Sequence, residues 1–129
     1  MIYVLDTHAI VWHVDNDSRL SPAAAAVLDN LAAELVIPTM ALVEIRFLYA
    51  KGRIKTSPPS VQQRIIAARN CKVHPLDEEV VSQIPTGLNI HDSIIVATAL
   101  VYRDVFQQPT TLITKDSEIS RSGLIQTLW

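Results

Sequence analysis

Four acidic residues lie where the sequence predicts strands to end or helices to begin. Asp6 and Asp116 each follow a short run of apolar or β-branched residues. Glu44 lies near the beginning of one predicted helix, and Asp92 lies in the first turn of another. In a parallel sheet, the carboxyl ends of the strands and the amino ends of the following helices lie at the same edge. The spacing therefore predicts that all four carboxylates meet there.

Such a group of carboxylates requires a cation, because like charges held together raise one another's pKa. Oxygen ligands without a cluster of Cys or His favour Mg²⁺ or Mn²⁺ over Zn²⁺. A site of this kind suits hydrolysis of phosphodiester bonds, since a bound metal activates water and stabilises the leaving oxygen. We therefore expect Asp6, Glu44, Asp92 and Asp116 to be both catalytic residues and metal ligands.

Each acid also has a structural interpretation when it is taken alone. Asp6 and Asp116 can cap the helical segments that follow them. Asp92 is favoured in a first helical turn by the helix dipole, with Asn89 available as the cap. Glu44 shares one helical face with apolar residues, where burial is costly without compensation, and its structural alternative is a partly exposed side chain paired with a nearby cation. The group of four, more than any single member, indicates a functional site.

The positions of these acids depend on strands and helices that alternate along the chain. Ser-Pro pairs at 21–22 and 57–58 predict an N-cap followed by Pro in the first turn, and Thr39 and Asp77 are predicted to cap two further helices. We expect strands at 2–5, 35–37, within 71–76, at 111–114 and at 125–128, and helices at 9–14, 22–33, 39–50, 58–70, 78–83, 90–102 and 117–120. This alternation predicts a three-layer α/β/α domain with a central, mostly parallel sheet of about five strands.

Composition limits the class of protein. At 129 residues the chain is expected to form one domain, residues 1–129. No apolar stretch approaches the roughly 18 residues of a membrane span, and no signal peptide is expected at the N-terminus. The single cysteine, Cys71, has no partner in the chain and fits a reducing cytoplasm. We therefore expect a cytoplasmic protein without a membrane anchor.

Net charge and hydropathy indicate which kinds of partner the chain can bind. The net charge of −2 argues against a strongly basic, general nucleic-acid binder, although setting the four site carboxylates aside leaves +2. The mean hydropathy of +0.23 is high for a small domain and indicates an apolar surface for a partner or a second copy. The alanine-rich stretch Ala23 to Leu28 is either such a contact surface, with Ala24 and Ala25 in it, or a covered internal helix.

Four motifs resemble those of the PIN-domain ribonucleases, most closely the VapC-like toxins of toxin–antitoxin pairs. They are LDTHAIVW at 5–12, ALVEI at 41–45, NIHDSIIVATAL at 89–100 and LITKD at 112–116. Their order and spacing match the family along the whole chain. The resemblance assigns the acidic cluster to Asp6, Glu44, Asp92 and Asp116, and the hydroxyl positions to Thr7 and Thr114. It implies an endoribonuclease that depends on Mg²⁺ or Mn²⁺, forms a homodimer and is inhibited by a small antitoxin protein.

Weaker candidates lie beside these motifs. His8 and His91 are each close to a predicted site acid and either contact substrate or serve in capping and packing. Arg46 either pairs with a site acid or contacts RNA. A basic segment after the Glu44 helix, Lys51 with Arg53 and Lys55, either binds phosphates or is a solvated turn at a helix C-terminus.

Two alternatives to the toxin remain open from the sequence. One is a nuclease of another role, in housekeeping RNA processing or acting on structured DNA. The other is an inactive PIN-like module that only binds RNA or a protein. The intact set of four acids favours catalysis, because a binding module has no need of clustered carboxylates. A neighbouring gene for a short DNA-binding antitoxin would favour the toxin role.

Overall fold

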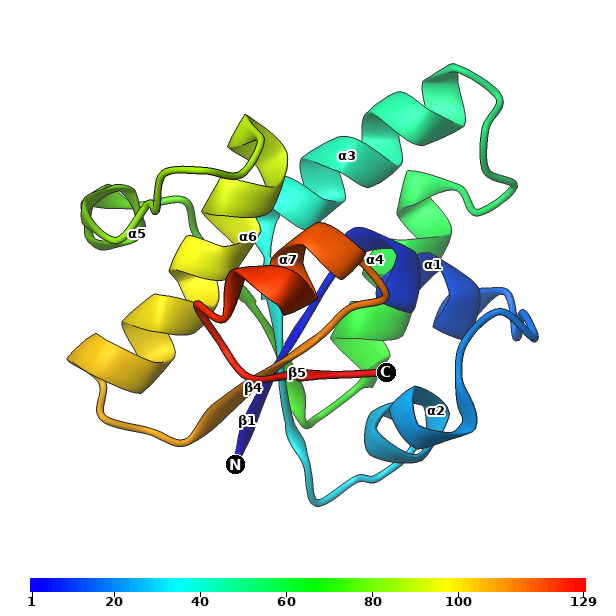
Figure 1. Ribbon diagram of the computed structural model, residues 1–129. Coiled ribbons are helices and arrows are strands. Elements are labelled where there is room, and N and C mark those ends of the chain that lie inside the picture. Colours follow the sequence, from blue (N-terminus) through cyan, green and yellow to red (C-terminus); the bar gives the residue numbers. More distant parts are fainter.

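A parallel sheet of five strands forms the centre of the computed structural model, which describes residues 1–129 (Figure 1). The strand order is β3-β2-β1-β4-β5, so β1 is the central strand. All four neighbouring pairs are parallel. The strands are β1 (Ile2–Leu5), β2 (Glu34–Pro38), β3 (Cys71–His74), β4 (Thr110–Ile113) and β5 (Thr127–Leu128). The predicted class of fold is confirmed, with a sheet that is wholly parallel.

Successive side chains of the central strands alternate between two hydrophobic clusters, one on each face of the sheet. In β1, Val4 packs into one cluster and Leu5 into the other. In β4, Leu112 and Ile113 divide in the same way. Both faces are therefore covered, which explains why these strands appear in the sequence as continuous apolar runs.

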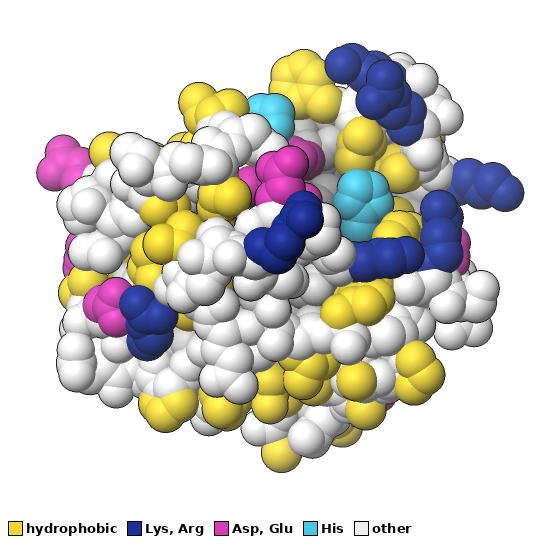
Figure 2. Space-filling model, in the orientation of Figure 1, with side chains coloured by type: hydrophobic (Ala, Val, Ile, Leu, Met, Phe, Trp, Pro, Cys, Tyr) yellow, Lys and Arg dark blue, Asp and Glu magenta, His cyan; other side chains and the backbone are white.

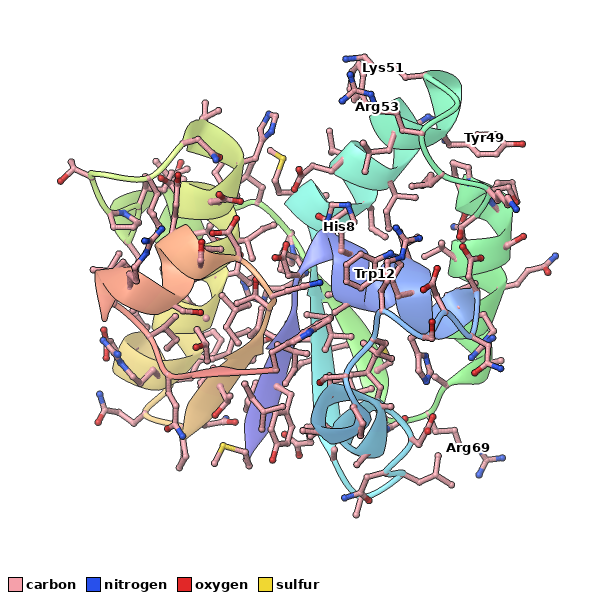
Figure 3. All side chains as sticks on the ribbon, turned by 45° about the vertical axis from the view of Figure 1, so that its right-hand side comes forward. His8, Trp12, Tyr49, Lys51, Arg53 and Arg69 are labelled. Atoms are coloured by element: carbon pink, nitrogen blue, oxygen red, sulfur yellow. The ribbon has the colours of Figure 1, made fainter.

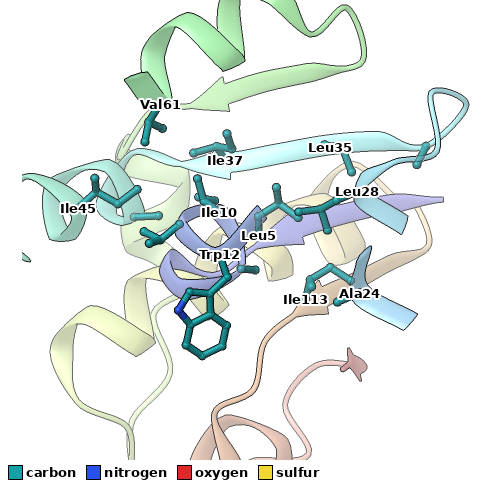
Figure 4. Packing of buried hydrophobic residues seen from close by; sticks show 14 residues of the cluster. Leu5, Ile10, Trp12, Ala24, Leu28, Leu35, Ile37, Ile45, Val61 and Ile113 are labelled. Atoms are coloured by element: carbon teal, nitrogen blue, oxygen red, sulfur yellow. The ribbon is translucent and has the colours of Figure 1, made fainter. Parts of the chain in front are cut away.

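Helices form the two outer layers around this sheet. Residues of α1, α2 and α4 pack on one face together with part of α3, with Trp12 at the edge of this cluster (Figure 4). Residues of α6, η1 and α7 pack on the other face. The helices are α1 (Thr7–Val14), α2 (Pro22–Leu28), α3 (Thr39–Ala50), α4 (Pro58–Ala67), α5 (Glu78–Ser82), α6 (Ile90–Leu100), the π-helical turn η1 (Val101–Val105) and α7 (Ser117–Ser122).

Most of the predicted helix caps are present. Ser21, Ser57 and Asp77 each accept a hydrogen bond from a backbone N–H in the first turn that follows. The prediction for Thr39 was wrong. Its hydroxyl donates instead to the carbonyl oxygen of His74 at 2.7 Å, and Pro38 occupies the N-cap position without a side-chain hydrogen bond. Thr39 therefore ties the beginning of α3 to the end of β3.

Two predicted helices end earlier than expected, α2 at Leu28 and α4 at Ala67. For α2, Asn70 provides the reason, because its side-chain amide donates to the carbonyl oxygens of Asn30 and Ala33. These bonds satisfy two backbone carbonyl oxygens of the turn that follows α2. The sixth helix also differs, since its α-helical part ends at Leu100 and continues as η1.

No helix combines the length and the apolar character needed to span a bilayer.

The alanine-rich helix α2 is anchored in the core, since Ala24 is completely buried and Leu28 is 6% exposed. Of the two alternatives for this helix, a contact surface or a covered internal helix, the buried face of α2 thus fits the second.

Candidate active site

The four predicted acids lie at one edge of the sheet, as their positions in the sequence indicated. Asp6 follows β1, and its backbone N–H donates to the carbonyl oxygen of Ile113 at the end of β4. Asp116 lies three residues beyond that point, while Glu44 lies in the second turn of α3 and Asp92 in the first turn of α6. All four are half-buried. They thus surround the carboxyl end of the central strand.

Two threonine hydroxyls fix the orientation of two of these carboxylates. Thr114 donates its hydroxyl to Asp6 Oδ2 at 2.6 Å, and Thr7 donates to Glu44 Oε1 at 2.9 Å. Both threonines are 2% exposed. Because a buried hydroxyl must keep its hydrogen bond, each threonine holds its carboxylate in one position. The two hydroxyl positions implied by the family resemblance therefore lie beside the acids.

The other two acids are held by helix caps. Asn89 is the N-cap of α6, where its Oδ1 accepts from the Asp92 backbone N–H at 2.9 Å and its amide donates to Asp92 Oδ2 at 2.7 Å. Asp116 is the N-cap of α7, and its Oδ1 accepts from the Ile119 backbone N–H at 3.0 Å. Asp6 is likewise the N-cap of α1. The capping interpretation is thus correct for Asp6 and Asp116, and it is compatible with a shared site.

Electrostatics show that the acids act on one another. Burial is the main cause that raises the pKa of Asp6, Glu44 and Asp92, and the charge of at least one neighbouring acid adds to it in each case. For Asp92 the pKa rises to about 6, with Asp116 and Asp6 as the strongest charged neighbours. The hydrogen bond from Thr114 opposes the rise at Asp6. Ionised carboxylates are therefore kept together at an energetic cost.

No lysine or arginine forms an ion pair with any of the four acids. The nearest basic group is His91, whose Nδ1 lies 3.8 Å from Glu44 Oε2. Figure 2 shows acidic side chains grouped in the upper part of this face, with a Lys or Arg side chain directly below the group and His side chains above it and to its right. The acids therefore have no Lys or Arg ion pair, although the charge of His8 opposes the rise in the pKa of Asp6 and Glu44, and that of His91 opposes it at Glu44.

The donor set fits a hard divalent cation. The acids offer only oxygen ligands, and a cation would offset the burial and the mutual repulsion that raise the pKa of Asp6, Glu44 and Asp92. No three or more His, Cys, Asp or Glu side chains are arranged to hold one metal ion together. Mg²⁺, however, commonly takes one or two protein carboxylates and completes its shell with water.

Some of the weaker candidate residues from the sequence lie at the site, and others lie elsewhere on the surface. The structure brings Thr7, Thr114 and His91 to the acids. Arg46 is exposed, has no ion pair and borders a hollow on another side of α3, together with Val61 and Ile66. Of the two alternatives for Arg46, the ion pair with a site acid is absent, because two residues along a helix turn a side chain to a different face, and contact with RNA stays a prediction.

One interaction of the site was not foreseen, namely the hydrogen bond from the Asn89 amide to Asp92 Oδ2. The sequence contained the signal for it. An asparagine at an N-cap has both an acceptor and a donor, and the residue three positions later lies directly beside it. Asn89 was assigned only the capping role. In the structure it also orients a site carboxylate.

Neutralising Asp92 is expected to stabilise the metal-free protein. A carboxyl group whose pKa is raised in the native state destabilises the fold as pH increases from about 4 to 6, and the penalty is complete above pH 6. After allowance for the partial exposure of Asp92, we expect Asp92→Asn to raise the free energy of unfolding at pH 7.5 by about 1 kcal/mol, or Tm by roughly 3–5 °C.

The measurement is thermal unfolding in EDTA at pH 7.5 and at pH 4, where the difference should disappear. Glu34→Gln is a matched control, because Glu34 is exposed on β2 and has no ion pair. If Asp92→Asn leaves Tm at pH 7.5 unchanged, the acids do not repel one another as described.

Comparison with known proteins agrees with this architecture. A family model described as PIN domain matches residues 3–123. No curated protein sequence matches the chain. Among solved structures, it is similar to VapBC2 from Rickettsia felis bound to a promoter DNA fragment, with a TM-score of 0.67 and 16% identity over 99% of this chain and 98% of that one.

Two further structures have the same fold. One is VapBC-1 from nontypeable Haemophilus influenzae, with a TM-score of 0.66 and 19% identity over 99% of this chain and 97% of that one. The other is FitAcB from Neisseria gonorrhoeae, with a TM-score of 0.63 and 17% identity over 100% of this chain and 97% of that one. At these identities the likeness concerns the fold.

Proposed function

This chain belongs to the PIN domain family, and from that premise we propose that it is an endoribonuclease that requires Mg²⁺ or Mn²⁺. The observation that carries the proposal is the set of four half-buried carboxylates at the carboxyl end of β1 without a basic partner from Lys or Arg. Such a set binds a cation readily, and a phosphodiester is the substrate class that a carboxylate-bound cation activates best.

In this proposal, Asp6 and Asp92 hold the cation, and Glu44 and Asp116 complete the negative surroundings. The cation, when bound, supplies Lewis-acid activation of water and stabilisation of the leaving oxygen. The threonines Thr7 and Thr114 keep their carboxylates oriented through the hydrogen bonds described above. Because these hydroxyls are buried, the ligands are positioned before substrate arrives, which reduces the entropy lost on binding.

The test is a cleavage assay with the purified chain and three substrates of one sequence: single-stranded RNA, single-stranded DNA and a DNA hairpin. We expect cleavage of the RNA in Mg²⁺. Preferential cleavage of the hairpin would instead indicate a nuclease for structured DNA. Binding of RNA without cleavage would indicate an inactive PIN-like module.

We also propose that the chain is the toxin of a cytoplasmic toxin–antitoxin pair and forms one domain over residues 1–129. The solved structures described above as VapBC and FitAcB support this role through their fold. A short gene for a DNA-binding antitoxin next to this one would favour the toxin role, whereas its absence would favour RNA processing. Growth arrest on expression, relieved by that neighbouring product, would separate the two roles directly.

A homodimer is part of the same proposal, but α2 is an unsuitable place to test it. Because Ala24 is completely buried, Ala24→Glu would unfold the protein whether or not a dimer exists. Exposed apolar side chains elsewhere are better candidates, for example Phe47 on α3, Val81 on α5 and Ile90 on α6, which are 63%, 57% and 70% exposed. Sedimentation at tens of micromolar protein should show a dimer, and a monomer would contradict it.

A further inference from the structure

A cleft of about 550 Å³ lies beside the acidic site, between α1 and the segment that follows α3. His8 and Trp12 line it from α1, and Arg53 and Lys55 line it from the opposite side. His8 is only two residues beyond Asp6, so the cleft begins where the acidic site ends. Figure 3 shows His8 beside Trp12 on α1, with Arg53 beyond the end of α3.

The segment after α3 is built so that its basic side chains face outward. Gly52 ends the helix with a φ of +71°, a conformation that favours glycine. Ile54 then packs against the hydrophobic cluster on the α1 side, and Thr56 is 4% exposed. Arg53 and Lys55 alternate with these two inward residues and are exposed. The core therefore fixes where both cations lie.

These two cations have no partner in the protein. The cleft also contains Arg19, Asp15 and Asp17, but Arg19 binds Asp17 with its Nε 3.1 Å from Oδ1 and its Nη2 2.8 Å from Oδ2. That pair is neutral as a unit. Neither Arg53 nor Lys55 forms an ion pair with any residue. Asp15 alone remains to balance them, so the cleft has a surplus of positive charge.

The aromatic part of the cleft presents one accessible ring. Trp12 is 8% exposed, because the guanidinium of Arg19, the ammonium of Lys115 and the indole of Trp129 all lie against it. His8 has its ring centroid 5.2 Å from that of Trp12 and is itself exposed. Trp12 therefore acts as a support, and His8 offers the surface on which another planar group can stack.

Arg53 links this cleft to the acidic site on a second side. Arg53 also borders a neighbouring hollow together with Lys51, Glu44 and His91. The same hollow is also lined by Met40, Val43, Phe47 and Leu48, so it joins Glu44 to Arg53 along a surface that is partly apolar. A substrate that fits this surface has its cleaved bond at the acidic site and further phosphates beside the cations of the cleft.

We propose that this cleft binds the single-stranded RNA on one side of the cleaved bond, with Arg53 and Lys55 on successive phosphates and His8 stacked on an adjacent base. The inference rests on the proposed ribonuclease function and assigns the substrate path for it. A single strand fits the observations better than a duplex, because a base can stack on His8 only when it is unpaired. Phosphate contacts here hold the strand without reading its sequence.

The experiment measures binding, not cleavage, so that its failure is distinct from failure of the proposed function. A fluorescent single-stranded RNA is titrated with the full chain in EDTA over a series of salt concentrations. Arg53→Gln/Lys55→Gln should weaken binding about tenfold at low salt and lower the slope of log Kd against log salt by about 1.4, since each lost phosphate contact removes about 0.7.

Matched variants decide the outcome. Arg64→Gln/Arg69→Gln removes the same charge from exposed residues of α4 and the turn after it, and should leave both affinity and slope unchanged. His8→Ala should weaken binding at least about fivefold, and His8→Phe should restore it by stacking. If Arg53→Gln/Lys55→Gln binds like the wild type, or if the control variant weakens binding equally, the proposal is overturned and the cleft is left for an acidic protein partner.

Discussion

Asp6→Asn is expected to reduce RNA cleavage at least about 1000-fold, the largest effect of any single substitution in this protein. Asp6 lies at the end of the central strand, and its charge raises the pKa of both Glu44 and Asp92. An asparagine keeps the N-cap geometry but has only one acceptor oxygen, whereas Asp6 accepts from the Thr7 N–H and from the Thr114 hydroxyl. The substitution thus removes both a metal ligand and one fixed contact.

The other acids are expected to follow in a definite order. Glu44→Gln and Asp92→Asn should also abolish most cleavage, while Asp116→Asn should be the most tolerant. Asp116 already commits Oδ1 to the Ile119 N–H, asparagine is an equally good N-cap, and a water can replace a peripheral carboxylate. Single-turnover rates measure these effects, and circular dichroism verifies folding. Greater loss at Asp116 than at Asp6 would contradict the order.

Removal of divalent metal is expected to abolish cleavage completely and reversibly. Activity should disappear in EDTA, return with Mg²⁺ or Mn²⁺, and show no requirement for Zn²⁺, because the site offers carboxylate oxygen and no thiolate. Calorimetric titration of Mn²⁺ provides a readout that does not depend on turnover. Asp6→Asn or Asp92→Asn should weaken that binding at least about tenfold, and Glu34→Gln should not.

Full cleavage in EDTA would indicate a different catalytic mechanism, without a metal ion. His8 and His91 lie nearest to the acids and would then be the first candidates for metal-free acid–base catalysis. His8→Gln and His91→Gln separate this case, since a catalytic histidine would be indispensable in EDTA. In the metal-dependent mechanism, His91→Gln removes only a weak partner of Glu44.

The sheet and the position of the acids could be predicted because they follow from local patterns. The apolar run before Asp6 is continuous since β1 is covered on both faces, and strand order brings β1 beside β4. Asn89 and Asp77 were recognised as caps because an N-cap is encoded within four residues. The site acids lie at ends of these same elements, so their convergence followed from the topology.

Features that depend on long-range contacts could not be predicted. Thr39 has the sequence of an N-cap, but its hydroxyl finds the carbonyl of His74, which lies 35 residues away. The end of α2 depends on Asn70, and the sequence around Leu28 does not contain that information. Arg53 and Lys55 could be assigned to a cleft only when Ile54 was seen to be anchored in the core.

The most direct measurement of the central claim is cleavage of single-stranded RNA in Mg²⁺ by the wild type and by Asp6→Asn/Asp92→Asn, expressed and purified identically. If the four carboxylates form a metal-dependent nuclease site, the wild type produces fragments and the double variant, still folded, produces none. Fragments formed at the same rate by both proteins would contradict the claim, because the cleavage would then come from another site or from a contaminating nuclease.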